Sequence, residues 1–180
     1  MDNIPEITTR RLRLRPVRLG DVMDVHRYVT NPNVLRYTSW QTPHEVSETR
    51  EFVKRLVHKP EGAFTLAICL QENSRVIGIV EFGSRREKGG VDYSLAEGYW
   101  NQGIMTEAVQ ATIDWAFSTL PELQTISSSA IPVNRGSTRV MEKCGMVFER
   151  RLQDKFERSD VPVILDEYAI HRDMWLRLRL

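Results

Sequence analysis

The chain has 180 residues, of which 41% are hydrophobic and 27% charged, a composition typical of one globular domain with a sizeable core. Its 25 Lys and Arg residues nearly balance its 24 Asp and Glu residues, so no global field attracts nucleic acid or an anionic membrane. No apolar run approaches the ~20 residues of a membrane span, and the amino terminus lacks the features of a signal peptide. We therefore expect a cytoplasmic protein whose partners include neither nucleic acid nor a membrane.

The two cysteines indicate neither a disulfide framework nor a metal site. Cys69 and Cys144 have no further Cys or His at the spacing of zinc ligands, and two cysteines are too few for a disulfide scaffold. We expect both to be buried thiols and expect no metal ion.

The first third of the chain predicts a strand followed by two helices. Residues 11–15 alternate between polar and apolar side chains, which is typical of a strand. Residues 21–29 place apolar side chains at helical spacing. The second helix is expected to begin with Thr42 as its N-cap and Pro43 in its first turn, because Glu45 completes a capping box.

The remainder of the chain predicts six strands and two helices, with no repeat or linker between them. In chain order these are strands at 63–69, 75–82 and 91–95, a helix across 105–116, a strand at 125–131, a helix across 137–144, and strands at 146–153 and 163–171. We therefore predict one α/β domain over residues 1–180, with a mixed, mostly antiparallel sheet of seven strands flanked by four helices.

A glycine-containing segment at residues 98–108 lies between a predicted strand and a long helix. The first amides of a helix lack intrahelical partners and carry the positive end of the helix dipole, so a turn at Gly103 suits a phosphate or pyrophosphate. The segment is neither a Rossmann glycine pattern nor a P-loop, since no Gly-Lys-Ser/Thr follows. A single glycine here can equally be no more than a turn.

A second motif, at residues 134–146, reads Asn-Arg-Gly-Ser-Thr-Arg-Val-Met-Glu-Lys-Cys-Gly-Met. With the Tyr-Trp-x-x-Gly-x-x-Thr-Glu-Ala run at 99–108, it resembles the RimJ/RimL-like branch of the GNAT family of acetyl-CoA-dependent N-acetyltransferases. The resemblance extends from Thr9 to Asp173, and the predicted order of elements is the order of that family. It implies a GNAT fold and acetyl-CoA as cosubstrate.

The resemblance also implies where the coenzyme would lie. Leu95 would lie beside the pantetheine arm, Asn134 would hydrogen-bond that arm, and Ser137 would lie near the sulfur. Trp100 replaces an Arg or Gln that is common in the family, and it is either part of the site or a surface aromatic without ligand contact. The residues whose amides would hold the pyrophosphate are Gln102, Gly103, Ile104, Met105 and Thr106.

The catalytic groups are less defined, because two positions depart from the family. Many relatives have a Glu where this chain has Gly90, and a Tyr seven residues after the Asn, where this chain has Met141. We expect Ser137 to act as general acid toward the leaving thiolate. The candidate bases, each of which could instead be a solvated or ion-paired surface carboxylate, are Asp92, Glu81 and Glu167.

The expected reaction is transfer of an acetyl group to a primary amine, foremost a protein or peptide N-terminal amine as the branch implies. A small-molecule amine acetyltransferase and a non-catalytic module that binds CoA or a partner are the alternatives. The acceptor is expected in a cleft rimmed by Arg36, Tyr37 and Trp40, in an irregular connection of the kind that often forms binding surfaces. The same three residues could instead be a packing anchor or the contact of a homodimer.

Overall fold

The computed structural model describes residues 4–38, 40, 42–155 and 162–179. Its strands are β1 (Ile7–Thr8), β2 (Leu12–Pro16), β3 (Ala63–Leu70), β4 (Val76–Arg85), β5 (Lys88–Leu95), β6 (Thr125–Ala130), β7 (Val147–Lys155) and β8 (Pro162–His171). Its α-helices are α1 (Val22–Val29), α2 (Pro32–Leu35), α3 (Val46–Val57), α4 (Ile104–Thr119), α5 (Arg135–Lys143) and α6 (Arg172–Arg177), with short 3-10 turns at Leu19–Asp21 and Glu97–Tyr99.

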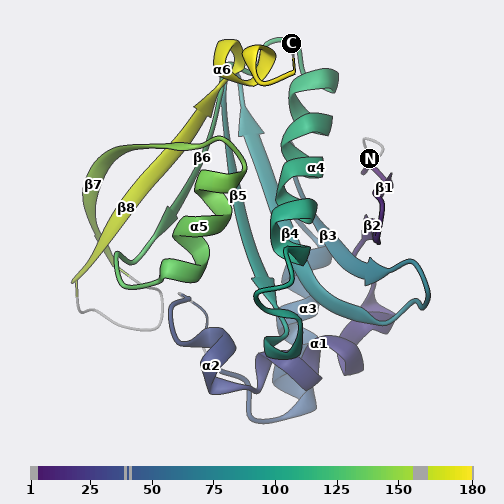
Figure 1. Ribbon diagram of the computed structural model, residues 1–180. Helices are drawn as coiled ribbons and strands as arrows, with labels where there is room; N and C mark the ends of the chain where they lie inside the picture. The colour runs from purple at the N-terminus through teal and green to yellow at the C-terminus, as the bar shows by residue number, and fades with distance from the viewer. Residues whose placement is uncertain (1–3, 39, 41, 156–161, 180) are drawn as a thin grey trace.

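The strands form one mixed sheet in the order β1-β2-β3-β4-β5-β6-β8-β7 (Figure 1). Every neighbouring pair is antiparallel except β5 and β6, which run parallel. The α/β class and the order of the long elements are thus confirmed. The expected seven strands and four helices are wrong, because the described part of the chain has eight strands and six α-helices.

The additional elements are β1, α2 and α6, which have two, four and six residues. Elements this short contain fewer than two full hydrophobic periods, which is too few for a repeating pattern to reveal them. The start of helix α2 nevertheless has a local capping signal. The side chain of Asn31 accepts a hydrogen bond from the Asn33 amide at 3.0 Å, and Pro32 occupies the first helical position.

Helix α3 begins later than the expected capping box at Thr42. Its N-cap is Glu45, and the Glu48 carboxylate accepts from the amides of His44 at 2.7 Å and Glu45 at 3.1 Å. These two hydrogen bonds lower the pKa of Glu48. Because Glu48 caps the helix that starts after Glu45, Pro43 lies before the first helical residue and not within the first turn.

Two buried clusters cover the two faces of the sheet. Leu66 and Ile68 of β3 pack with the buried side of α4, whereas their neighbours Ala67 and Cys69 pack with α1 and α3. This alternation is what a strand buried on both faces requires. The thiols of Cys69 and Cys144 are free and buried, as the sequence predicted.

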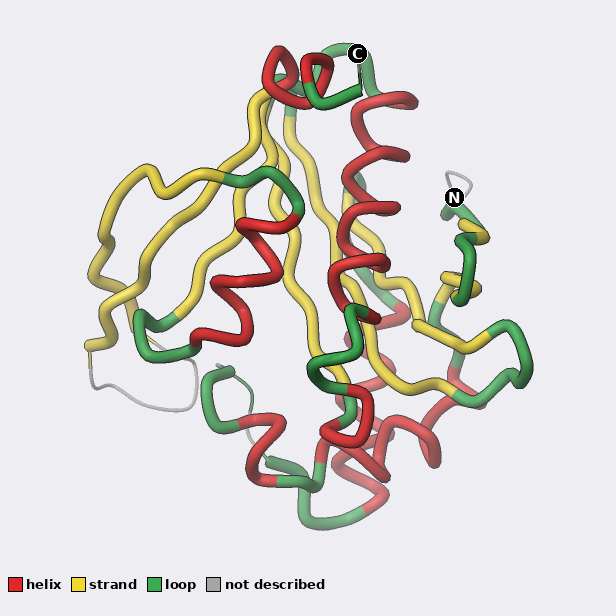
Figure 2. Tube along the Cα trace, in the orientation of Figure 1, coloured by secondary structure: helices red, strands yellow, loops and turns green. Residues whose placement is uncertain are grey.

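The sheet opens where β5 and β6 part. Their parallel pairing covers only Lys88–Gly90 against Thr125–Ser127, although β5 continues to Leu95 and β6 to Ala130. Figure 1 shows the two strands diverging, with the loops that lead to α4 and α5 following their separated ends. The tube in Figure 2 shows the loops that make these two strand-to-helix connections. The residues of both sequence motifs therefore lie at the same opening.

Candidate active site

A pocket with a volume of about 440 Å³ lies at the opening between β5 and β6. Its walls come from β4, β5 and β6, from the start of α5, from the connection after α2, and from Asp154 of β7 and Leu165 of β8. The pocket thus joins segments from almost the whole length of the chain.

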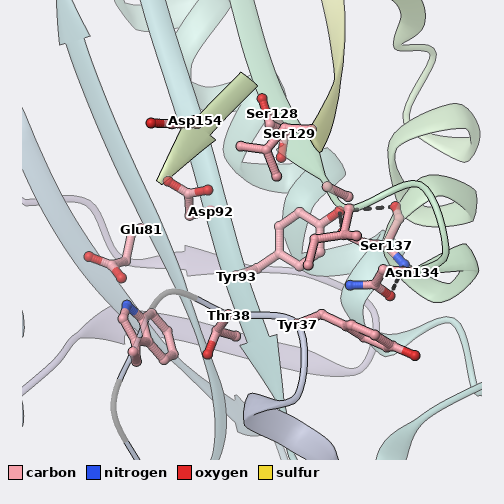
Figure 3. A pocket seen from close by; sticks show the side chains of 14 residues that line it. Tyr37, Thr38, Glu81, Asp92, Tyr93, Ser128, Ser129, Asn134, Ser137 and Asp154 are labelled. Carbon is pink, nitrogen blue, oxygen red and sulfur yellow. Dashed lines mark hydrogen bonds between the residues drawn. The ribbon is translucent and has the colours of Figure 1, made fainter. Parts of the chain in front are cut away.

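The pocket has two chemically different sides (Figure 3). Asp92 of β5 pairs across the sheet with Glu81 of β4, so both carboxylates lie on the sheet face that packs against α1 and α3. Tyr93 is next along β5 and therefore points to the opposite face, where its hydroxyl meets α5. We call Glu81 and Asp92 the carboxylate side, and Tyr93, Asn134 and Ser137 the hydroxyl side.

The hydroxyl side is an ordered network at the start of α5. Asn134 is the N-cap, and its Oδ1 accepts a hydrogen bond from the Ser137 amide at 3.2 Å. The Ser137 Oγ lies 2.9 Å from the Tyr93 Oη, which also lies 3.1 Å from the Ser137 carbonyl oxygen. Burial raises the pKa of Tyr93 well above its usual value, so the phenol stays protonated.

Tyr93 is a pocket residue that the sequence reasoning did not select. Strict alternation along the predicted strand at residues 91–95 does indicate that Tyr93 lies on the face opposite Asp92. What the alternation does not show is that α5 begins over that face.

The carboxylate side contains an ion pair and a second carboxylate. Glu81 forms a salt bridge with Lys59, which follows α3. Asp92 is accessible from the pocket and also borders a second cavity of about 240 Å³ that Lys59 lines. Desolvation by the surrounding protein raises the pKa of Asp92, and the charge of Glu81 raises it further, whereas Lys59 lowers it.

The third candidate base lies elsewhere. Glu167 of β8 forms an ion pair with Arg150 of β7, with 2.5 Å between Oε2 and Nε. It is not among the residues that line the pocket. The structure therefore brings Asp92 and Glu81 together with Ser137 and leaves Glu167 outside this group.

The turn before α4 leaves the first amides of that helix without hydrogen-bond partners in the described residues. Gly103 is the N-cap with a φ of +74°, in the left-handed region that favours glycine. Within the described residues, the amides of Ile104, Met105 and Thr106 have no hydrogen-bond acceptor. These donors point out of the positive end of a 16-residue helix and fit the expected pyrophosphate.

Two side chains hold this turn in place. Arg11 donates from Nη1 to the Gln102 carbonyl at 2.9 Å and from Nε to the Glu107 carboxylate at 2.6 Å. Trp100 donates its indole N–H to the Leu95 carbonyl at 2.8 Å. Trp100 is thus an anchor between the loop and the end of β5.

The aromatic residues of the early connection divide between the pocket and its surroundings. Tyr37 and Trp40 line the pocket, and the Trp40 ring also packs on Phe52 of α3 with 4.9 Å between ring centroids. Arg36 lies outside the lining, with its guanidinium 5.3 Å from the centre of the Tyr37 ring. Trp40 therefore combines the expected position at the rim with the alternative role of packing anchor.

The described residues include no group of three His, Cys, Asp or Glu side chains placed to hold a metal ion. None of the helices in these ranges is both long enough and apolar enough to cross a membrane.

Comparison with known proteins decides the family. Residues 11–147 match the acetyltransferase (GNAT) domain. The chain belongs to this family. The N-acetyltransferase YnaD of Bacillus subtilis, itself uncharacterised, is 32% identical over 146 residues, which cover 78% of this chain and 81% of YnaD. A GNAT-family acetyltransferase from Bacillus anthracis has a crystal structure that superposes with a TM-score of 0.82 at 26% identity, covering 94% of this chain and 99% of that one.

The GNAT fold is shared with more distant enzymes whose acceptors differ. RimL, a ribosomal L7/L12 α-N-protein acetyltransferase, has a TM-score of 0.79 at 19% identity, covering 93% of this chain and 94% of that one. Spermidine N-acetyltransferase from Vibrio cholerae, in complex with CoA and spermine, has a TM-score of 0.77 at 19% identity, covering 93% and 99%. This GNAT protein is an N-acetyltransferase that uses acetyl-CoA.

Proposed function

We propose that this GNAT enzyme receives acetyl-CoA from the side of α4 and α5, and that a primary amine reaches the acetyl group from the carboxylate side. The observation that carries the proposal is the pocket between β5 and β6, which brings Ser137 and Asp92 to opposite sides of one opening. An acetyl group placed in this opening would have a hydroxyl near its sulfur and a carboxylate near the incoming nitrogen.

The coenzyme fits this side through backbone groups and one amide side chain. The amides of residues 102–106 would bind the pyrophosphate, and Leu95, at the separated end of β5, would lie beside the pantetheine arm. Because Oδ1 of Asn134 is engaged with the Ser137 amide, the NH₂ group of Asn134 is the donor that would meet a pantetheine carbonyl.

Asp92 is the base that we propose for the acceptor. An amine is mostly protonated near neutral pH, so it must lose a proton before it attacks the thioester carbonyl. The raised pKa of Asp92 makes this carboxylate a better proton acceptor than an exposed one. The neutral amine nitrogen then bonds to the carbonyl carbon and gives up its second proton to water, and the carbon–sulfur bond breaks. Ser137 donates its hydroxyl hydrogen to the leaving sulfur and recovers a proton from water.

For the acceptor we propose the N-terminal amine of a protein or peptide. The two sequence motifs of the RimJ/RimL-like branch support this choice, together with the fold shared with RimL. A small cationic amine is the second candidate. The carboxylates of Glu81 and Asp92 favour it, and spermidine acetyltransferases are among the relatives of this chain.

Mass spectrometry of reactions with acetyl-CoA distinguishes the candidates. The acceptors are a set of peptides with free N-termini, the same peptides blocked at the N-terminus, and spermidine. We expect a gain of one acetyl group on the free N-termini alone. Acetylation of spermidine with none of the peptides would establish the small-amine function instead.

A thermal-shift measurement tests the coenzyme separately. Acetyl-CoA at about one hundred times its Kd stabilises the native state by ~2.7 kcal/mol and so raises Tm. A shift without thiol release for any amine would identify a coenzyme-binding module that does not catalyse transfer. Absence of a shift would contradict the proposed coenzyme site.

A further inference from the structure

Inside the pocket, a hydroxyl group of β5 contacts the start of α5. The Tyr93 Oη lies 2.9 Å from the Ser137 Oγ and 3.1 Å from the carbonyl oxygen of the same residue. Figure 3 shows both interactions, with Ser137 between Tyr93 and Asn134. Ser137 is therefore held through three of its own atoms, since its amide is bound by Asn134.

The contact between the Tyr93 and Ser137 hydroxyls can have two hydrogen-bond arrangements. The Ser137 carbonyl can only accept, and the phenol has one hydrogen to donate. If Tyr93 donates to the carbonyl, Ser137 must donate to Tyr93, and the serine hydrogen is directed at the tyrosine. If Tyr93 donates to the serine Oγ, the serine hydrogen is released for another acceptor in the pocket.

The tyrosine hydroxyl at the start of α5 thus belongs to strand β5 and not to a residue of α5. Position 141, seven residues after Asn134, is a fully buried methionine in the core. We propose that Tyr93 is a positioning residue for transfer, which donates to the Ser137 oxygen and thereby directs the serine hydrogen at the sulfur of acetyl-CoA. This inference rests on the proposed function, since it takes the sulfur to lie at Ser137.

Tyr93 keeps its own hydrogen throughout. Burial disfavours the tyrosinate, so the phenol orients and polarises the serine hydroxyl without transferring a proton itself. A hydrogen bond that Tyr93 donates to the serine oxygen makes the serine hydrogen a stronger donor. The benefit appears only when the sulfur gains charge, so kcat is affected more than acetyl-CoA binding.

The test is a double-mutant cycle with Tyr93→Phe, Ser137→Ala and the pair. Ser137→Ala should lower kcat by ~10²–10⁴-fold if the hydroxyl is the general acid. Tyr93→Phe removes one neutral hydrogen bond and keeps the ring, so we expect a kcat about tenfold lower and an unchanged KM for acetyl-CoA. In the Ser137→Ala background, Tyr93→Phe should have no further effect on kcat.

Three results would overturn the inference while leaving the proposed function intact. The first is an unchanged kcat in Tyr93→Phe, and the second is an equal loss of kcat when Tyr93→Phe is made in the wild type and in Ser137→Ala. The third is loss of the basic limb of the profile of kcat against pH in Tyr93→Phe, which would make Tyr93 a proton donor. Wild-type protein that releases no thiol with any amine would instead overturn the proposed function. Tyr168→Phe on β8, outside the pocket lining, is the matched control. All variants are assayed below their own Tm.

Discussion

Strand β5 pairs over its full length with one neighbouring strand and over only three residues with the other. On one edge β4 pairs with it from Lys88 to Leu95, antiparallel and without interruption. On the other edge β6 pairs only with Lys88–Gly90, and beyond these residues Asp92 and Tyr93 line the pocket. One strand therefore has a closed edge that belongs to the core and an open edge that belongs to the site.

The difference shows how a sheet makes room for a ligand without losing its core. Buried backbone N–H and C=O groups need partners. At the closed edge β4 supplies them, and at the open edge we propose that a coenzyme arm that carries amides does so, in the manner of a strand added to a sheet. The side chains proposed for chemistry gather where the strand neighbour is missing.

The largest effect is expected from the carboxylate side of the open edge. Asp92→Asn removes the proposed base and should lower kcat by ~10²–10⁴-fold in steady-state assays with a peptide acceptor. The same variant should raise Tm at pH 7. Because the fold raises the pKa of Asp92, the ionised carboxylate destabilises the native wild-type protein above that pKa. The difference in Tm between Asp92→Asn and the wild type should therefore narrow as pH falls.

Glu167→Gln is the matched control for this change, because Glu167 lies on β8 outside the pocket lining. If Glu167→Gln lowers kcat as far as Asp92→Asn does, the assignment of the base to the pocket is wrong.

Two glycines compare the tight contact between β4 and β5 with the last residue at which β5 pairs with β6. A Cβ at Gly78 of β4 would lie 2.5 Å from the Ser94 carbonyl oxygen, so Gly78→Ala must push β4 away from β5 and should destabilise by ~1–3 kcal/mol. A Cβ at Gly90 would meet only the Ser127 carbonyl oxygen, at 3.9 Å. Gly90→Ala should change the free energy of unfolding by less than ~0.5 kcal/mol or increase it.

Urea denaturation of the two variants measures both values. Equal destabilisation at the two glycines would show that the backbone at Gly90 is packed as tightly as the backbone at Gly78.

A smaller effect is expected at the turn that follows β5. Gly103→Ala has ordinary space for its Cβ, 3.5 Å from Arg11 Nη2, but its φ of +74° costs an alanine about 1–2 kcal/mol. If the turn relaxes and its amides move, the Kd for acetyl-CoA measured by calorimetry rises by roughly 5–30-fold. Gly98→Ala, in open space in the same loop, should leave the Kd unchanged. An unchanged Kd in both variants would place the pyrophosphate elsewhere.

The smallest effect concerns the ion pair beside Asp92. Lys59 lowers the pKa of Asp92 and Glu81 raises it. Lys59→Met should therefore move the acidic limb of the kcat profile to higher pH, and Glu81→Gln should move it to lower pH. Shifts of the same sign in both variants would show that Asp92 does not set this limb.

The sequence predicted those parts of the fold that depend on local pattern. The long strands and helices follow from hydrophobic periodicity. The start of α3 was wrong because two overlapping acidic patterns, at Glu45 and Glu48, both satisfy the capping rule. Only contacts of the folded backbone choose between them.

The candidate site was predictable where its groups lie in contiguous motifs. Gly103 with the amides after it, and Asn134 with Ser137, lie in single turns of the chain, and the structure places both turns at the opening of the sheet. Whether they bind the coenzyme stays a prediction. The carboxylates could be named from the sequence but not ranked, because each lies on a strand and its surroundings come from other strands.

By itself, the sequence determined the family, the order of the long elements and the two motifs at helix starts, because these depend on neighbours within a few residues. The tertiary structure decided that β5 and β6 separate after three pairs, that Lys59 lies against Glu81, and that Tyr93 meets Ser137. The last two contacts join residues 22 and 44 positions apart. Such contacts are fixed by the packing of whole elements, which no local pattern of side chains encodes.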